Sequence, residues 1–215
     1  MHRLIMNSAT YRQASNHTSR AAETADPGNR LLWKMNGRRL EGEAIRDAML
    51  AVSGRLNPKQ FGPGVYPALP EGVAGLKIKN RTAWDASDEE ETRRRSIYIF
   101  QMRQLPDPFL TVMDAGVPHD SCDRRKVSTT ALQALTMLNG SLIASEAAHF
   151  AARLAAEARD DVDGRIKLAF QIAHARQPST EELSKAREFV AADSKNGWES
   201  FCRVILNSNE FVYVE

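Results

Sequence analysis

The sequence has little cysteine and lacks the motifs that attach haem or build a cysteine zinc site. Its 215 residues contain two cysteines, Cys122 and Cys202, far apart in the chain. No C-x-x-C or C-x-x-C-H motif is present, so this chain alone holds neither a c-type haem nor a cysteine-ligated zinc ion. Two free buried thiols and a single disulfide are both compatible with this spacing.

Patterned metal and phosphate sites are also missing. One polar segment, 114–123, gathers residue types that ligate metals, but no second patterned group and no helical histidine pair accompanies it. No glycine-rich phosphate loop and no G-x-S-x-G nucleophile motif occurs. We therefore expect no metal ion and no cofactor in this chain. The members of the metal-like segment are Asp114, His119, Asp120, Cys122 and Asp123.

Long hydrophobic runs and an excess of one charge are absent as well. No apolar run approaches the ~20 residues that cross a bilayer, and the apolar stretch after Met1 is too short for a signal-peptide core. The 29 lysines and arginines balance 27 acidic residues, for a net charge of +2. This balance disfavours a dedicated nucleic-acid binder, so we expect no membrane span and no nucleic-acid partner.

The residues that are present indicate one mainly helical domain spanning 1–215. Apolar residues make up 42% and charged residues 26%, values near the averages of globular proteins. Apolar side chains recur at helical spacing in two long stretches, with Ile45, Met49 and Val52 in the first and Ile143 to Leu154 in the second. We predict an antiparallel helical bundle. The predicted helices lie at 1–12, 30–54, after Pro106, and from about 130, 141, 164, 179 and 198 onward.

Two of these helices carry clear start signals. Ser128 to Thr130 offers N-caps for the helix with Leu132, Leu135 and Leu138. Ser179 and Glu182 have the spacing of a capping box. These positions predict where the bundle helices begin.

A long irregular insertion, 57–93, interrupts the helical pattern. Its prolines and glycines preclude a long helix, and a brief alternation at 75–79 indicates a short strand. Residues 96–100 are β-branched and aromatic and form the best strand candidate. The polar segment 13–29 is predicted to be a loop, and the tail 211–214 to be extended.

Arginines and carboxylates are the strongest candidates for a binding site. A forked guanidinium suits a buried carboxylate partner, and it equally suits an anionic ligand such as a sulfated or uronic sugar. The sequence leaves both a structural ion-pair network and a ligand site open. The candidate residues are Arg30, Arg39, Glu43, Arg46, Asp47, Arg94, Arg95 and Arg125.

Several stretches together resemble the C-terminal domain of unknown function of planctomycete cytochrome-c-like multidomain proteins. Leu132 departs from this pattern, because similar members carry proline before Gln-Ala-Leu. The ending 206–211 (Leu-Asn-Ser-Asn-Glu-Phe) is the most specific stretch. The other stretches are 2–6, 8–13, 26–27, 29–33, 38–41, 43–47, 94–98, 133–135 and 138–139.

The resemblance implies where such a protein is located and which domains accompany it, rather than which activity it has. Such proteins are longer, often carry a secretion signal and an upstream haem module, and look periplasmic or cell-envelope located. The chain is then expected to be a C-terminal fragment whose partners are the upstream domains, with polysaccharide as a further candidate. We hypothesise a binding or scaffolding domain, and as the alternative a carbohydrate-active enzyme domain acting on anionic polysaccharide. No catalytic residue follows from the resemblance, and the sequence leaves open whether the chain is an enzyme.

Overall fold

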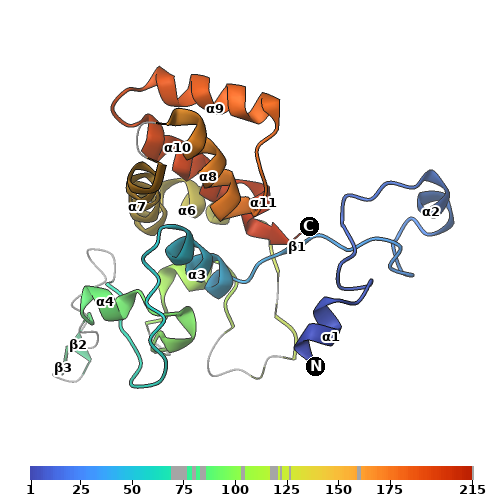
Figure 1. Ribbon diagram of the computed structural model, residues 1–215. Helices are drawn as coiled ribbons and strands as arrows, with labels where there is room; N and C mark the ends of the chain where they lie inside the picture. The colour runs from blue at the N-terminus through green and yellow to red at the C-terminus, as the bar shows by residue number, and fades with distance from the viewer. Residues whose placement is uncertain are drawn as a thin grey trace.

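The protein is mainly helical, as its sequence predicts (Figure 1). The computed structural model describes residues 1–68, 77–78, 81–82, 86–102, 105–116, 121, 123–125, 127–158 and 161–214. Strands in this part of the chain are two residues long and form two separate antiparallel pairs. Within the same ranges, no helix has the length and apolar character needed to cross a bilayer.

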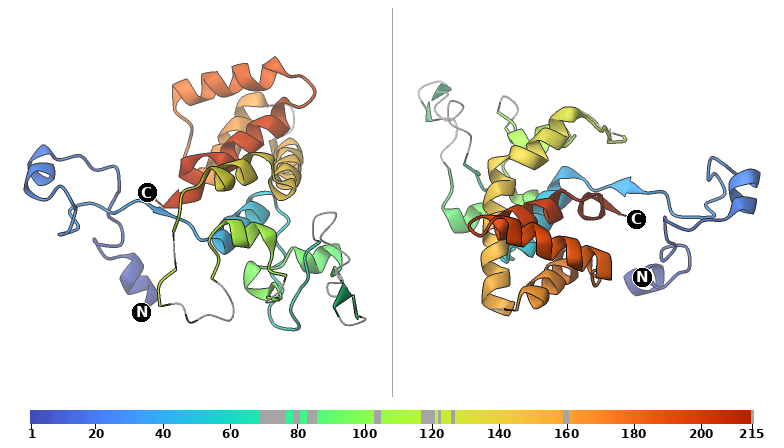
Figure 2. Two further views of the ribbon diagram at one scale, coloured as in Figure 1. Left: turned by 180° about the vertical axis from the view of Figure 1, so that it is seen from behind. Right: turned by 90° about the horizontal axis from the view of Figure 1, so that it is seen from above.

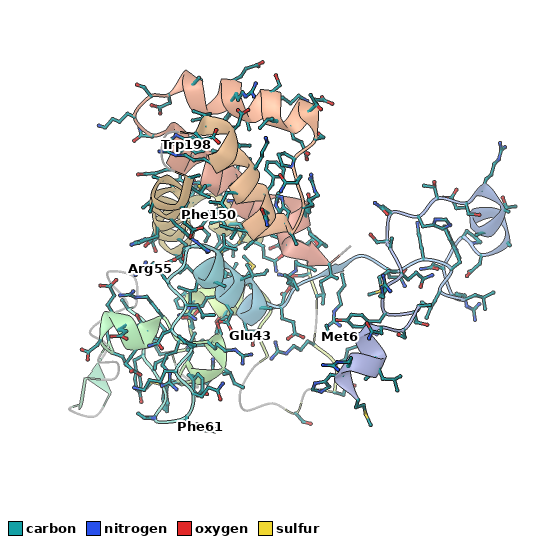
Figure 3. All side chains as sticks on the ribbon, in the orientation of Figure 1. Met6, Glu43, Arg55, Phe61, Phe150 and Trp198 are labelled. Atoms are coloured by element: carbon teal, nitrogen blue, oxygen red, sulfur yellow. The ribbon has the colours of Figure 1, made fainter. Side chains whose placement is uncertain are left out.

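The main core lies within a bundle of four helices. These are α7 (Ser141–Ala158), α8 (Val162–His174), α9 (Thr180–Ala192) and α10 (Gly197–Asn207). Helix α10 packs against α7 and α9, and α8 packs against the same two helices. Figure 3 shows Phe150 inside the bundle, and its side chain is fully buried together with Ile143, Ala147 and Leu154. The predicted apolar face of α7 is therefore confirmed, and burial of each large side chain contributes about 1.5–3 kcal/mol.

The predicted helix starts at Thr130 and Ser179 are confirmed. Thr130 Oγ1 accepts a hydrogen bond from the Gln133 main-chain nitrogen at 3.2 Å, and Gln133 Oε1 accepts one from the Thr130 nitrogen at 3.1 Å. Ser179 and Glu182 form the same reciprocal pair at the start of α9. Both pairs satisfy N–H groups that a helix start otherwise leaves without partners.

Helix α6 (Ala131–Asn139) turns its leucines away from the core. Leu132, Leu135 and Leu138 are 59%, 55% and 54% exposed, whereas Gln133 and Met137 are buried. Gln133 Nε2 donates to the Val112 carbonyl oxygen at 3.0 Å. This hydrogen bond directs the polar side of α6 inward, so leucine spacing does not identify the buried face here.

The first long helix is shorter than predicted. Helix α3 runs Gly42–Val52, and its predicted stripe of Ile45, Met49 and Val52 is buried. The prediction of a helix over 30–41 is wrong. This stretch contains β1 (Arg38–Arg39), which is paired with the C-terminal strand and cannot continue the helix. The helix ends two residues before Gly54, the last residue of the predicted range, and Gly54 adopts a φ of 79° that favours glycine after a helix.

The insertion holds a small hairpin and one helical turn. Strand β2 (Lys77–Ile78) pairs with β3 (Arg81–Thr82), and α4 (Glu89–Thr92) follows. The strand predicted at 75–79 is confirmed at 77–78, and its other residues lie outside the described ranges. The strand predicted at 96–100 is wrong for 96–98, because η1 (Ser96–Tyr98) is a 3₁₀ turn, whereas Ile99 forms an isolated parallel β-bridge with Val65. Asp47 Oδ1 accepts from both the nitrogen and the hydroxyl of Ser96, each at 2.7 Å, and holds that turn.

Residues 1–36 form an arm that extends away from the bundle (Figures 1 and 2). The arm contains α1 (His2–Met6) and α2 (Arg20–Ala25). The helix predicted over 1–12 is therefore confirmed for 2–6 only. The loop predicted at 13–29 is wrong at 20–25, where α2 lies. Ser19 caps α2, and the helix-favouring residues that follow it outweigh the polar surroundings on which the loop prediction rested.

The base of the arm and the C-terminal segment meet beside the bundle. Helix α5 (Pro108–Val112) precedes α6, and α11 (Asn209–Val212) leads into β4 (Tyr213–Val214). The predicted extended tail is thus confirmed for β4 and wrong for 211–212. Strand β4 pairs antiparallel with β1, and Leu40 N donates to the Val212 carbonyl oxygen at 2.8 Å. The base of the arm is therefore bound to the C-terminal segment.

Candidate functional site

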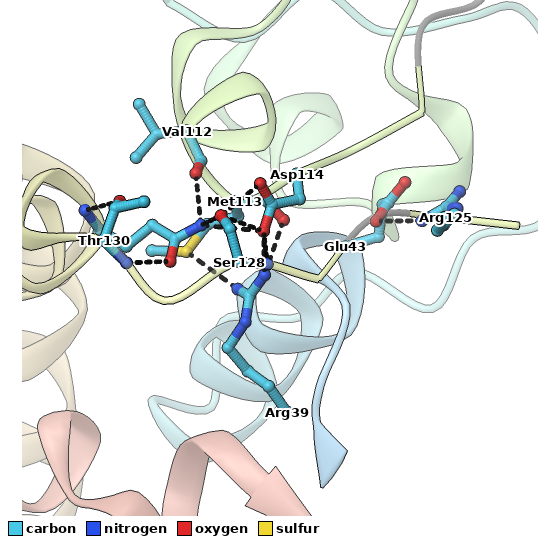
Figure 4. A network of polar contacts seen from close by, with 9 residues as sticks. Arg39, Glu43, Val112, Met113, Asp114, Arg125, Ser128 and Thr130 are labelled. Atoms are coloured by element: carbon cyan, nitrogen blue, oxygen red, sulfur yellow. Dashed lines mark hydrogen bonds and ion pairs between the residues drawn. The ribbon is translucent and has the colours of Figure 1, made fainter.

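Arg39 and Asp114 form the centre of a buried polar network (Figure 4). Nη2 of Arg39 donates to Asp114 Oδ2 at 2.6 Å, and the Arg39 side chain is 6% exposed. Arg39 also contacts the carbonyl oxygen of Met113 at 3.4 Å. Its Nε is buried and has no hydrogen-bond partner among the described residues. A guanidinium held in this way binds two chain segments that are distant in sequence.

Asp114 receives further hydrogen bonds from the segment before α6. The Ser128 nitrogen donates at 2.8 Å and Gln133 Nε2 at 2.9 Å. Burial acts to raise the pKa of Asp114, but these hydrogen bonds and the charge of Arg39 outweigh it, so the pKa lies below its ordinary value. Asp114 is therefore a carboxylate at neutral pH. It has a φ of 62°, a left-handed conformation that aspartate tolerates better than most residues.

A pocket of about 690 Å³ opens beside this network. Arg125 lies at its rim and donates from Nη1 to Glu43 Oε2 at 2.9 Å and to Glu41 Oε2 at 3.2 Å. Arg39 and Asp114 belong to the wall of the same pocket. The structure thus brings together Arg39, Glu43 and Arg125 from the predicted set.

Arg46 and Asp47 lie in a different cluster, between α3 and η1. Arg46 is 5% exposed and donates from Nη1 to the Arg94 carbonyl oxygen at 3.0 Å and to Ser96 Oγ at 3.2 Å. Burial lowers the pKa of Arg46 from its ordinary value, although Asp47, Asp107 and Glu146 act to raise it. Asp47 is itself bound by Ser96, so this cluster holds η1 against α3.

Arg94 forms a third cluster within the insertion. Its side chain is fully buried and donates to the carbonyl oxygens of Lys59, Phe61 and Pro63. The guanidinium carbon lies 3.9 Å from the centre of the Tyr98 ring. Arg94 therefore organises the 59–63 loop, which has no helix or strand to hold it.

Two predicted residues stand apart from these buried groups. Arg95 is 63% exposed and reaches Asp47 Oδ2 only at 3.7 Å. Arg30 lies on the arm, where its main-chain nitrogen donates to Asp26 Oδ1 at 3.0 Å. The structure therefore divides the predicted network into three clusters and two surface positions. Arg39, Arg46 and Arg94 donate into the protein interior.

The predicted metal-like segment is only partly described. Asp114 and Asp123 lie in the described ranges, while His119, Asp120 and Cys122 do not. In the described part of the chain, no three metal-ligating side chains gather closely enough to hold an ion. Cys202 is a free thiol buried on α10, and burial raises its pKa. Cys202 is therefore unsuited to act as a nucleophile.

Comparison with protein families gives a match over most of the chain. The family model described as PSD1, protein of unknown function (DUF1553), matches residues 1–190. The chain belongs to this family. Neither the curated proteins nor the solved structures contain a match to the chain.

In this DUF1553 domain, the sequence analysis missed an ion-pair network at the C-terminal end, formed by Arg176, Glu182 and Glu210 and called here the Arg176 brace. Arg176 binds Glu182 and Glu210 at once, with both guanidinium–carboxylate pairs bidentate at 2.6–2.9 Å. Glu210 belongs to the stretch 206–211, which lies beyond the matched residues, and Ser208 of the same stretch caps α11. The specificity of that ending could have pointed to these residues, because each of them fixes the turn between α10 and β4.

The brace predicts that the DUF1553 domain loses stability in acid. Hydrogen bonds from Arg176 lower the pKa of Glu182 from 4.5 to about 2, and they also lower the pKa of Glu210. A carboxylate whose pKa is lower in the folded state stabilises the fold above its unfolded pKa, and that contribution is lost as pH falls toward the folded value. The melting temperature should therefore fall between about pH 5 and pH 2.

The variant Glu182→Gln tests this acid dependence, and Glu181→Gln is its matched control. Glu181 is 76% exposed, and within the described ranges it pairs with Lys185 alone, so the melting curve of its variant should keep the acid dependence of the unmodified chain. Glu182→Gln should melt lower at neutral pH and show a shallower fall in acid. An unchanged slope for Glu182→Gln would contradict the assignment.

Proposed function

We propose that this chain is a binding and scaffolding domain of a larger planctomycete-type envelope protein, in which it docks on an upstream cytochrome-c-like module. The observation that carries this proposal is the composition of the arm. In residues 1–36 only Asn29 is buried, whereas Leu4 and Leu31 are 79% and 84% exposed. An apolar surface of this kind is typical of a protein interface.

The arm is held by polar contacts rather than by a hydrophobic core. Asp26 accepts from the main-chain nitrogens of Arg30 and Leu31, and Asn29 Nδ2 donates to the Lys34 carbonyl oxygen at 2.8 Å. Gln13 Nε2 reaches the Leu32 carbonyl oxygen at 2.8 Å. These bonds fix the backbone while leaving apolar side chains such as Leu31 and Leu32 on the outside.

The charge of the arm indicates the nature of its partner. Basic residues outnumber acidic ones in the arm, while the whole chain is nearly balanced. The surface that receives it should therefore be apolar with an acidic rim. The charged residues of the arm are Arg3, Arg12, Arg20, Arg30, Lys34, Glu23 and Asp26.

Covalent attachment of a c-type haem does not fit the residues of this chain. Cys202 is buried on α10 and free, and the sequence contains no C-x-x-C-H motif. A covalently bound haem would therefore belong to the upstream module of the proposed protein. The role of this chain would be to hold that module beside the bundle.

The proposal predicts that the arm is protected in the longer native protein. Amides of residues 1–36 should exchange hydrogen much more slowly there than in the isolated chain, because docking removes the arm from solvent. Hydrogen exchange followed by mass spectrometry measures this difference directly. Amides of α7 provide the internal reference, since the bundle is folded in both forms. Equal exchange of the arm in both forms would exclude it as the docking element.

A matched pair of variants tests the same surface in the isolated chain. Leu31→Ser in the arm should reduce the fluorescence of a bound hydrophobic dye. Phe189→Ser on α9, where Phe189 is 45% exposed as a single apolar residue, should change the signal little.

A further inference from the structure

A second pocket lies where the two hydrophobic cores of the domain meet. It has a volume of about 580 Å³ and lies between α3, α5 and the start of α7. Phe109 contributes to its wall and packs against both the main core and the small cluster of Val65, Ile99 and Leu110. This volume is within the usual range of small-molecule sites, about 300–1,000 Å³. We name it the α3–α7 pocket.

Most of the wall of the α3–α7 pocket is apolar. Leu50 and Ile143 form its floor as buried residues, and Phe109, Val112 and Leu142 add partly buried surface. Such a wall binds a carbon skeleton and excludes water from it. A ligand that fits must therefore present a sizeable apolar body.

Charged groups also converge on this pocket, and they are unusually buried. Arg46 is 5% exposed, Asp107 is 8% exposed and Glu146 is 2% exposed. Arg55 and Arg93 complete the set, so three guanidinium groups meet two carboxylates in the wall. Glu89 and Asp47 lie outside the wall, but Glu89 binds Arg55 and Arg93, and Asp47 lies 3.7 Å from Arg46. A ligand anion would therefore share these guanidinium groups with internal carboxylates.

Internal partners already occupy the carboxylates. Glu146 accepts from Ser53 Oγ at 2.6 Å and from Arg55 Nη1 at 2.9 Å. Asp107 accepts from the Leu110 nitrogen at 2.9 Å as the N-cap of α5. Carboxylates beside a bound ligand repel a doubly charged anion more than a singly charged one.

The start of α7 adds a further positive element. Gly140, Ser141, Leu142 and Ile143 all belong to the wall of the pocket, and α7 is 18 residues long. The first N–H groups of a helix have no acceptor within the helix, and the helix dipole favours an anion at that end. The guanidinium groups and the start of α7 thus face the same space.

We propose that the α3–α7 pocket binds a small organic carboxylate with an apolar body. The carboxylate would lie near Arg46, Arg93 and the start of α7, and the carbon skeleton would pack on Phe109, Val112 and Leu142. A phosphate ester carries more charge beside Asp107 and Glu146 and is the less suitable ligand. This site is independent of the arm and of any docking partner.

The test compares three probes on the complete chain: 4-phenylbutyrate, its neutral amide and phenyl phosphate. Titration calorimetry should give the carboxylate at least about tenfold tighter binding than the amide, because only the carboxylate makes charge-assisted hydrogen bonds. Equal binding of acid and amide would overturn the proposal, and so would tighter binding of phenyl phosphate. Carboxylate binding weaker than about 1 mM would also overturn it.

Variants then locate the binding site. Val112→Trp fills the pocket and should abolish carboxylate binding, whereas Ala152→Trp, on the exposed side of α7, should leave it unchanged. Arg93→Met should weaken binding about tenfold with little effect on folding, since Arg93 is 30% exposed and its partner among the described residues is Glu89. If Val112→Trp fails to fold by circular dichroism, Arg93→Met decides the question. Unchanged binding in Arg93→Met would then place the ligand elsewhere and refute the site.

Discussion

Replacing Arg94 with methionine should lower the free energy of unfolding by about 3–5 kcal/mol. Methionine retains much of the apolar volume but removes every donor to the carbonyl oxygens of Lys59, Phe61 and Pro63. Those oxygens then lose their charged donor, and the contact with the Tyr98 ring is lost. Urea unfolding followed by circular dichroism measures the change.

Arg95→Met is the matched control for this experiment. Arg95 is the next residue in the chain, but its side chain is 63% exposed and its ion pair with Asp47 Oδ2 is long, at 3.7 Å. An exposed pair of this kind contributes about 0–1 kcal/mol, so its variant should unfold nearly as the unmodified chain does. Equal losses for Arg94→Met and Arg95→Met would show that Arg94 does not organise the loop.

Replacing Asp114 with alanine should cost a similar amount, about 3–5 kcal/mol. The change leaves the buried guanidinium of Arg39 without its counter-ion and removes the acceptor of Ser128 and Gln133. Alanine is also strained at a φ of 62°. Thermal and urea unfolding should both show the loss.

Two further variants separate the causes of this loss. Asp114→Asn tolerates the same backbone conformation and retains an acceptor, so it should cost less than the alanine variant. Asp123→Ala removes an exposed carboxylate near the same pocket and should change stability by no more than about 0.5 kcal/mol. A loss at Asp123 as large as that at Asp114 would contradict the ion-pair assignment.

Helix locations could be predicted from the sequence because local signals agree with packing in the bundle. The capping boxes at Thr130 and Ser179 depend on residues three positions apart, and the stripe on α7 depends on helical period alone. Neither depends on which segments meet in space. Residues 96–100 show the opposite case. Their β-branched composition favours a strand, but Asp47, far away in the chain, binds Ser96 and imposes a turn.

The candidate site could be predicted only as a set of residue types. The sequence showed that arginines and carboxylates were numerous, but not that Arg39 would face Asp114 or that Arg46 would face Thr92 and Arg94. Such pairings depend on loops that cross the domain, and loop paths leave no periodic signal. Glu146 was missed for a related reason, because one acidic residue among the alanines of α7 resembles an exposed position.

The β1–β4 pair links the base of the arm to the C-terminal end of the helical bundle, so it bears part of any mechanical force on the arm. Arg38 lies opposite Val214, so the arm leaves the pair at the end where β4 stops. A force that pulls the arm away from β4 at this end breaks the hydrogen bonds of the pair one after another. A force along the strands would load all of these hydrogen bonds together. The pair should therefore open at low force, and its opening would separate the arm from the C-terminal segment before α7 to α10 begin to unfold.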